Sequence, residues 1–278
     1  MNFRETDGKT EPTKANRGEV RRFPGLPLKL AGMALLVLIW ALMGQIIFRM
    51  PEYEQFDGFM PLPTLKALSK MVLSSVYWNS VGASLTRVTA GIGYAFLIGL
   101  PGGLLIGFYS RLRLLTAVPV QFLRMISPLA WMPIALLVFL RFDSAIIFLV
   151  TMATVWPILL NTVSGVANVN PQWIHMARNQ GADNFQLITR ILLPASVPHI
   201  FTSLRLSIGV AWIVLVPAEY MGVTSGLGYI INDARDTLEY DRLMATVISI
   251  GLLGFLLDSA VQSLERVFYH RQGKNPFE

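Results

Sequence analysis

The sequence predicts an all-α membrane protein with about six transmembrane helices, and two observations lead to that class. Of its 278 residues, 53% are hydrophobic and only 14% are charged, whereas soluble domains carry roughly 25% charged residues. The apolar residues also gather in runs long enough to cross the hydrocarbon, which takes about 20 residues. We expect six such spans, at about 28–48, 88–109, 114–140, 145–166, 200–221 and 243–264.

The first span is expected to remain as a membrane anchor. The polar residues 1–27 before it are predicted to form a disordered cytoplasmic tail. That stretch is longer than the leader of a signal peptide, and no small-x-small cleavage site follows Phe48. Residues 28–80 then comprise the first transmembrane helix and an external amphipathic segment at 61–80, which either anchors the chain or meets an external partner.

Residues 81–270 are predicted to form the core, followed by a cytoplasmic C-terminal tail at 271–278. The third span is interrupted by three prolines, so its boundaries stay open. Between the fifth and sixth spans, the acidic stretch 232–242 is expected to be an external loop and a possible docking surface.

Basic residues fall on alternate connections, which sets the expected orientation. The N-terminal tail, the connection with Arg111 and Arg113, the connection with Arg178 and Arg190, and the C-terminus are all basic. The positive-inside rule therefore places both termini and the connection near residue 180 in the cytoplasm. This topology accounts for the excess of 23 Lys and Arg over 17 Asp and Glu, so we expect no nucleic-acid partner.

Residues 171–194, the helical pair, are predicted to form two short helices with a bend between them. The Asn-Pro sequence at 170–171 suits an N-cap and first turn. Gly181 suits the left-handed residue that closes a helix. Asp183, with a glutamine three residues later, fits a capping box. We expect this second helix to run to about Leu193 and to be stopped by the proline that follows.

The helical pair is also predicted to be amphipathic. Apolar residues recur at three- and four-residue steps and predict one apolar stripe: Trp173, Ala177, Phe185, Ile188 and Leu192. A bent pair with one apolar and one polar side, held at the membrane surface, is typical of a docking element. The alternative is an interfacial linker that binds no partner.

Small residues recur every fourth position in the second span, at Gly91, Ala95, Gly99, Gly103 and Gly107. Side chains this small allow close helix–helix approach, either within one chain or between two copies.

Ionisable residues inside apolar segments are costly, so each is a candidate functional group. Arg124 is the predicted counter-charge for an anion in a translocation path, with a structural ion pair or a surface position as alternatives. Glu219 would repel an anion and is expected to act as a gate or a structural hydrogen-bond partner. Trp131 is a further path candidate, with packing as its alternative. Arg205 and Asp258 are expected to form a salt bridge.

Two other functional classes find little support in the sequence. A membrane enzyme would need a catalytic constellation, but there is no HExxH motif and there are only three histidines and no cysteine. A self-powered secondary transporter or a channel would need inverted repeats or several midplane ionisable groups, and no internal repeat is visible.

The helical pair resembles the cytoplasmic motif of bacterial ABC-importer permeases, E-A-A-x-x-x-G followed by nine residues and I-x-L-P. Gly181 is followed after nine residues by Ile191-Leu192-Leu193-Pro194, with Ala177 at the third motif position. His175 and Met176 replace the usual Glu and first Ala. The stretches "ISPLAWMPIALLVFLRFDSAIIFLVTMATVWPILLNT" and "LLPASVPHIFTSLRLSIGVAWIVLVPAEYMGVTSGLGYII" extend the resemblance over about 80–270, within the nitrate/sulfonate/bicarbonate branch.

This resemblance implies a type I importer permease fold and a bacterial inner-membrane protein that works as a homodimer. Two cytoplasmic ABC ATPase subunits would bind ATP and Mg²⁺, and an external solute-binding protein would deliver the substrate. The chain itself lacks a G-x-x-x-x-G-K-[ST] phosphate loop, so it would be a permease, not an enzyme, with no cofactor or metal of its own.

The branch implies a small inorganic anion as substrate, with nitrate or nitrite as first choice and bicarbonate or cyanate next. Alkanesulfonates such as taurine are the alternative. The residues that the resemblance assigns to ATPase coupling are Trp173, His175, Ala177, Arg178, Gly181, Ala182, Phe185, Ile191, Leu193 and Pro194.

Overall fold

The computed structural model describes residues 25–48 and 50–271, and helices are the only regular secondary structure in this part of the chain. Most of the predicted N-terminal tail and nearly all of the C-terminal tail lie outside the described residues. The helices are α1 Gly25–Ile47, α2 Pro61–Val72, α3 Ser75–Phe108, α4 Ser110–Met125, α5 Met132–Val138, α6 Phe142–Ala167, α7 Pro171–Asn179, α8 Asn184–Leu187, α9 Leu193–Gly222, α10 Leu227–Asp236 and α11 Tyr240–Arg271. Three short turns join them: η1 Glu54–Phe59, η2 Pro128–Trp131 and the π turn η3 Ile188–Leu192.

Five helical segments of the described chain are long and apolar enough to cross a membrane, and a bent pair adds a sixth candidate. The long segments are α1, α3, α6, the continuous stretch from α8 to α9, and α11. These helices confirm the all-α class with about six transmembrane segments. The bent pair consists of α4 and the segment 128–138, which meet at 83°.

The third predicted span, 114–140, is therefore not one straight helix. The chain breaks at Ile126 and Ser127, whose ψ angles of 124° and 127° are extended. Pro128 explains the break, because a proline ring disfavours the helical conformation of the residue before it.

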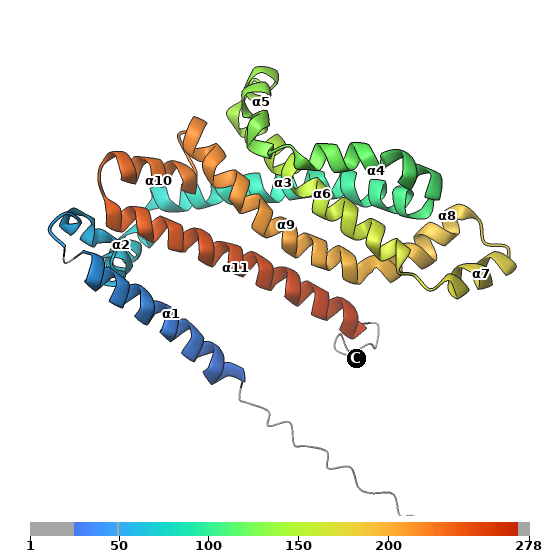
Figure 1. Ribbon diagram of the computed structural model, residues 1–278, viewed down its shortest axis with the longest axis horizontal. Helices are drawn as coiled ribbons and strands as arrows, with labels where there is room; N and C mark the ends of the chain where they lie inside the picture. Colours follow the sequence, from blue (N-terminus) through green and yellow to red (C-terminus); the bar gives the residue numbers. More distant parts are fainter. Residues whose placement is uncertain (1–24, 49, 272–278) are drawn as a thin grey trace, which may run out of the picture.

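Four long helices, α3, α6, α9 and α11, lie side by side along the long axis of the molecule (Figure 1). The helical pair with α7 and α8 lies at one end of this bundle, and α10 lies near the other end. Helix α1 diverges from the bundle, and only 6% of its apolar window is buried. The two ends of the bundle carry the two candidate sites described below.

Helices α3 and α6 pack closely along the stripe of small residues that recur every fourth position in α3. A methyl group added at Gly103 would lie 2.6 Å from Cβ of Thr162, and one added at Gly107 would lie 2.7 Å from Cβ of Val166. Ala95 is fully buried in the same stripe. The stripe thus serves close packing within one chain, the first of the two predicted uses.

Two segments differ from the sequence prediction at their ends. The amphipathic helix expected at 61–80 ends at Val72, because the chain is extended at Ser74 and α3 begins at Ser75. The predicted second span started at residue 88, so it missed the first 13 residues of α3. The stretch 232–242 is not an open loop: it contains the end of α10 and the beginning of α11.

Candidate functional site

The caps predicted for the helical pair are confirmed. The Asn170 side chain accepts a hydrogen bond from the Gln172 amide at 2.9 Å and caps α7. At the start of α8, the Asp183 carboxylate accepts from the Gln186 amide at 2.7 Å, and the Gln186 side chain accepts from the Asp183 amide at 3.2 Å. These reciprocal bonds form a capping box, which fixes where the second helix begins.

The bend between α7 and α8 depends on Gly181. Its φ of +82° is left-handed, a conformation that glycine adopts without the steric penalty of a Cβ atom. Ala182 donates its amide to the Ala177 carbonyl at 3.0 Å, and Gly181 donates to the Arg178 carbonyl at 2.9 Å. This pattern is a Schellman motif, and it satisfies the carbonyls at the end of α7 while the chain turns.

The prediction that Pro194 stops the second helix was wrong. The chain passes from α8 through the π turn η3 into α9 as one continuous span, 184–222. Pro194 occupies the first turn of α9. The wider π turn accommodates a proline ring and its missing amide, which an uninterrupted α-helix tolerates poorly. The helical pair is therefore joined directly to α9.

The buried face of the helical pair packs against the ends of α3 and α6. Leu192 is only 1% exposed and lies in a small core with Leu104 and Val166, against which Ile174 and Ile188 also pack. This contact holds the pair to the body of the protein.

Three large apolar side chains of the helical pair are exposed, and we refer to them together as its exposed apolar face: Trp173, Met176 and Phe185, which are 52%, 61% and 74% exposed. The sequence analysis placed Trp173 and Phe185 on one stripe with Leu192, and the structure corrects this. The bend at Gly181 turns the two helices relative to each other, so residue spacing counted across it does not define one face. The helical pair therefore has buried apolar side chains and others, named above, that are more than half exposed.

The other residues predicted for coupling are spread around the helical pair. His175 is exposed, and Ala177 and Ala182 are half-buried beside the bend. Ile191 and Leu193 are half-buried against the same small core. Arg178 lies on the side of α7 that carries Ile174, and donates to the Asn184 side chain at 3.3 Å.

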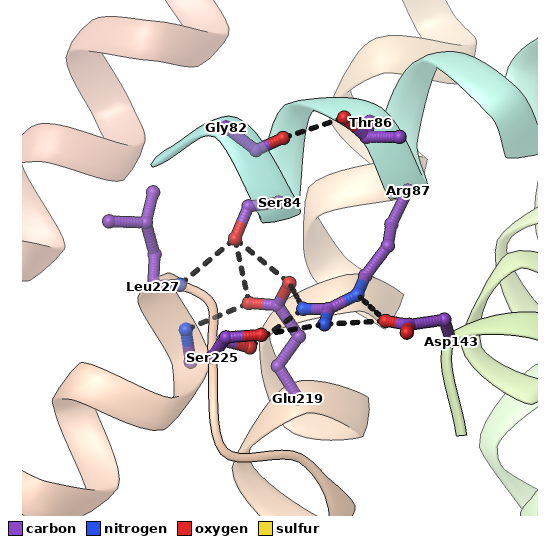
Figure 2. Close-up of polar contacts among 9 residues, drawn as sticks. Gly82, Ser84, Thr86, Arg87, Asp143, Glu219, Ser225 and Leu227 are labelled. Atoms are coloured by element: carbon purple, nitrogen blue, oxygen red, sulfur yellow. Dashed lines mark hydrogen bonds and ion pairs between the residues drawn. The ribbon is translucent and has the colours of Figure 1, made fainter. Parts of the chain in front are cut away.

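A second candidate site lies near the other end of the bundle, where five polar residues from three helices and a loop meet (Figure 2). We call it the Arg87 cluster: Ser84 and Arg87 of α3, Asp143 of α6, Glu219 of α9 and Ser225 of the α9–α10 loop. The side chains of Arg87 and Glu219 are only 4% and 0% exposed, so this ion pair is excluded from solvent, whereas the Asp143 side chain is 49% exposed.

The Arg87 guanidinium holds the cluster together. Its Nη1 donates to Glu219 Oε1 at 2.6 Å and to the Ser225 carbonyl at 2.8 Å. Its Nε and Nη2 both donate to Asp143 Oδ1, at 2.9 and 2.6 Å. Because every charged group has an opposite charge within hydrogen-bond distance, the buried arginine is compensated.

Glu219 also caps α10 from outside that helix. The Gly228 amide donates to Glu219 Oε2 at 2.9 Å, and the Leu227 amide donates to the Ser84 hydroxyl at 2.9 Å. The same hydroxyl donates to Glu219 at 2.8 Å. The first amides of α10 are thus satisfied, and a carboxylate lies at the positive end of the helix dipole. Gly226 makes this possible, since a Cβ there would lie 2.5 Å from Glu219 Cδ.

Glu219 was predicted as a gate or a structural hydrogen-bond partner, but Arg87 was not predicted at all. The only available signal was a lone arginine in the apolar run "VGASLTRVTAGIG". Its partners lie 56 and 132 residues away in the sequence, so no local pattern could reveal them.

The three residues predicted for a translocation path are not brought together. Arg124 is exposed in the last turn of α4, and no described residue forms a hydrogen bond or ion pair with it. Trp131 is half-buried and packs on the main core, whereas Glu219 is saturated by the Arg87 cluster. The expected Arg205–Asp258 salt bridge is confirmed, with Nε and Oδ1 2.7 Å apart.

A family match decides what kind of protein carries these two sites. Residues 99–271 match the family described as the binding-protein-dependent transport system inner membrane component. The chain belongs to this family. It is the inner-membrane permease subunit of an ABC importer and not itself an enzyme. Permeases of this kind work with ATPase subunits and a solute-binding protein.

Three relatives of the chain are permeases named for bicarbonate, nitrate and taurine. It is 34% identical to the bicarbonate transport system permease protein CmpB of Synechococcus elongatus, over 88% of this chain and 90% of that one. It is 37% identical to the nitrate import permease protein NrtB of a Synechocystis species, over 74% and 78%. Identity to the taurine transport system permease protein TauC of Escherichia coli is 28%, over 86% and 87%.

A solved structure shows the same fold. The present structure aligns with a chain of a bacterial alginate ABC transporter, in complex with its alginate-bound periplasmic protein, with a TM-score of 0.59. The alignment covers 87% of this chain and 94% of that chain at 17% sequence identity. The ABC importer permease fold predicted from the sequence is thereby confirmed.

Proposed function

We propose that this permease imports a small inorganic anion and that the helical pair transmits the work of separate ATPase subunits to it. In this proposal two copies of the chain form the pathway, and both termini and the helical pair lie in the cytoplasm. ATP and Mg²⁺ are bound by the ATPase subunits. An external solute-binding protein delivers the anion at the opposite side.

The observation that carries the coupling role is the exposed apolar face of Trp173, Met176 and Phe185. Three large apolar side chains on a short, polar, bent element are poorly placed in water, and such patches mark protein–protein contacts. Aromatic and methionine side chains are also the types enriched at interfaces. A cleft on an ATPase subunit is the proposed partner of this face.

The connection into α9 supplies the path for the force. Because η3 joins α8 to α9 without a break, a displacement of the helical pair moves the cytoplasmic end of α9. The other end of α9 carries Glu219 and is tied into the Arg87 cluster. Leu193 and Glu219 are separated by roughly 39 Å of helix, so α9 links the driven end to a fixed end.

Replacement of Gly181 tests the coupling role. Gly181→Val places a β-branched residue at a φ of +82°, where such residues are strained, and it is expected to abolish ATP-driven uptake while basal ATPase activity of the assembled transporter persists. Gly181→Asn is the matched control, because asparagine tolerates the left-handed region. Normal uptake by the valine variant, or equal losses in both variants, would contradict the proposed role.

Nitrate or nitrite is the proposed substrate, followed by bicarbonate or cyanate, because relatives at 34–37% identity are named for bicarbonate and nitrate. The alternative is an alkanesulfonate, supported by the resemblance to a taurine permease. Arg124 remains the proposed counter-charge, since its guanidinium is exposed and unpaired among the described residues.

Uptake of labelled nitrate, bicarbonate and taurine by the reconstituted transporter decides the substrate. Accumulation of nitrate or bicarbonate, reduced in Arg124→Gln, is the expected result. Accumulation of taurine alone would contradict the inorganic anion as substrate and support an alkanesulfonate. The proposed coupling role would not be affected.

A further inference from the structure

A cavity of about 640 Å³ lies between the α3–α4 corner and the junction of α6 with α7. Its walls include three arginines from two separate segments of the chain: Arg111 and Arg113 of α4, and Arg178 of α7. Among the described residues that line it, none is acidic. Three positive charges thus face one space without a counter-charge in its walls.

The arginines retain most of their hydrogen-bonding capacity. Arg113 donates at 2.6 Å to the Gly107 carbonyl at the end of α3, and Arg178 makes one longer bond at 3.3 Å to Asn184. No described residue accepts a hydrogen bond from Arg111. Because a guanidinium carries five N–H donors in a planar fork, the cavity offers many donors to a ligand with several acceptor oxygens.

The backbone adds to this positive character. Helix α4 begins at Ser110, which also lines the cavity, with no side-chain cap and no acidic residue in its first turn. The first amides of a helix are unsatisfied and carry the positive end of the dipole. The remaining wall is apolar, formed largely by the ends of α3 and α6. Such a site fits a molecule that has an anionic head and an apolar part attached to it.

The position of the cavity, at the ends of two candidate membrane helices, indicates which molecule supplies the anionic group. Helices α3 and α6 are both candidate membrane spans, and both end here, at Phe108 and Ala167. The ends of membrane spans lie at the level of the lipid headgroups. Basic pockets between membrane helices bind anionic headgroups, and paired arginines match the geometry of phosphate oxygens.

We propose that this cavity binds a phosphate group, supplied by an anionic phospholipid headgroup, and that the bound phosphate ties the helical pair to the α3–α4 corner. Arg178 makes this link possible. It shares the side of α7 with Ile174, so it faces the cavity and not the exposed apolar face. The proposal concerns lipid binding and does not depend on which anion is imported.

The test uses the assembled transporter in a neutral detergent, titrated with phosphatidylglycerol or phosphatidylcholine and observed by native mass spectrometry. The cavity variant is Arg111→Gln/Arg178→Gln; Arg113 is left intact because it caps α3. The matched control is Arg190→Gln/Arg266→Gln, which removes two exposed arginines that do not line the cavity. The single variant Arg111→Gln serves if the double cavity variant does not assemble.

We expect phosphatidylglycerol to bind the unaltered transporter more tightly than phosphatidylcholine. The cavity variant should lose on the order of tenfold in that affinity, the typical effect of one charge-assisted hydrogen bond or more, while the control changes little. A parallel titration with inorganic phosphate, without anionic lipid, identifies the source. Binding of free phosphate that the cavity variant loses supports the same site with a soluble ligand.

Equal losses in the cavity and control variants would show only general attraction to a basic surface and would overturn the proposal. Absence of both lipid and phosphate binding in the assembled transporter would also overturn it. Neither readout depends on ATP hydrolysis or uptake, so failure here is distinguishable from failure of the proposed transport function.

Discussion

The two ends of the helical bundle are built on opposite principles. At the Arg87 cluster, the buried charges pair with one another and the first amides of α10 have acceptors. There is no room for a side chain at position 226. In the helical pair, Trp173 and Phe185 stand in the open, and a methyl group at Gly181 would meet nothing within 4 Å. One end is fixed by polar contacts within the described chain, whereas the other leaves large apolar side chains exposed.

This difference between the two ends predicts how mutations at each end affect stability and coupling to the ATPase subunits. Breaking a buried charge pair leaves an uncompensated charge, which is strongly destabilising. Changing an exposed side chain affects folding little, and its effect must be sought in an interaction with another protein. We therefore expect mutations at the Arg87 cluster to lower stability, and mutations in the helical pair to lower coupling with small effects on stability.

The largest effect on stability is expected for Glu219→Ala. It leaves the buried Arg87 with Asp143 as its only acidic partner and removes the cap of Gly228, so the free energy of unfolding should fall by about 3 kcal/mol. The measurement is denaturation of the detergent-solubilised chain. Asp236→Ala is the control, since its ion pair with Arg235 is more than half exposed and worth under about 1 kcal/mol. Similar losses of unfolding free energy in both variants would contradict the distinction between the buried and the exposed ion pair.

Gly226→Ala is expected to have the next largest effect, about 2 kcal/mol of destabilisation, because it adds both a strained φ of +122° and a clash with Glu219. Gly209→Ala provides the contrast. A Cβ there meets nothing within 4 Å, and alanine favours a helix interior over glycine by up to about 1 kcal/mol. Thermal unfolding of the two variants should therefore shift in opposite directions. Shifts of the same sign would show that the Arg87 cluster is less tightly packed than described.

Asp183→Ala should give the smallest effect on global stability. It removes the capping box of α8, worth about 1 kcal/mol locally, but α8 lies on the surface. Amides 184–190 are expected to exchange hydrogen about fivefold faster, while the global free energy of unfolding is nearly unchanged. Asp183→Ser retains an N-cap and should exchange at close to the original rate. A large global destabilisation would contradict the view of the helical pair as a locally held element.

The parts of the fold that follow local rules could be predicted from the sequence. Apolar runs located the membrane helices, and capping residues such as Asp183 located where the helices of the helical pair begin. The spacing of small residues predicted a closely packed face on α3. Each of these signals lies within one helix or at its end.

The remaining features depend on contacts between distant segments. Arg87 lies one residue before the predicted second span, and only the fold brings Glu219 to it. Pro194 looked like a helix stop because its effect on an ideal α-helix is known, but a π turn was not foreseeable from composition. The convergence of Arg111 and Arg178 likewise follows from the fold, which brings the α3–α4 corner and α7 to one cavity.

Site-directed crosslinking tests the central claim most directly, and the absence of native cysteine makes the chain well suited to it. Phe185→Cys places a thiol on the exposed apolar face, and Leu73→Cys places one at an 88% exposed position between α2 and α3, away from the helical pair. In the assembled transporter, Phe185→Cys is predicted to crosslink to an ATPase subunit with a yield that changes on ATP binding, while Leu73→Cys does not. Crosslinking from Leu73→Cys but not from Phe185→Cys would contradict the account.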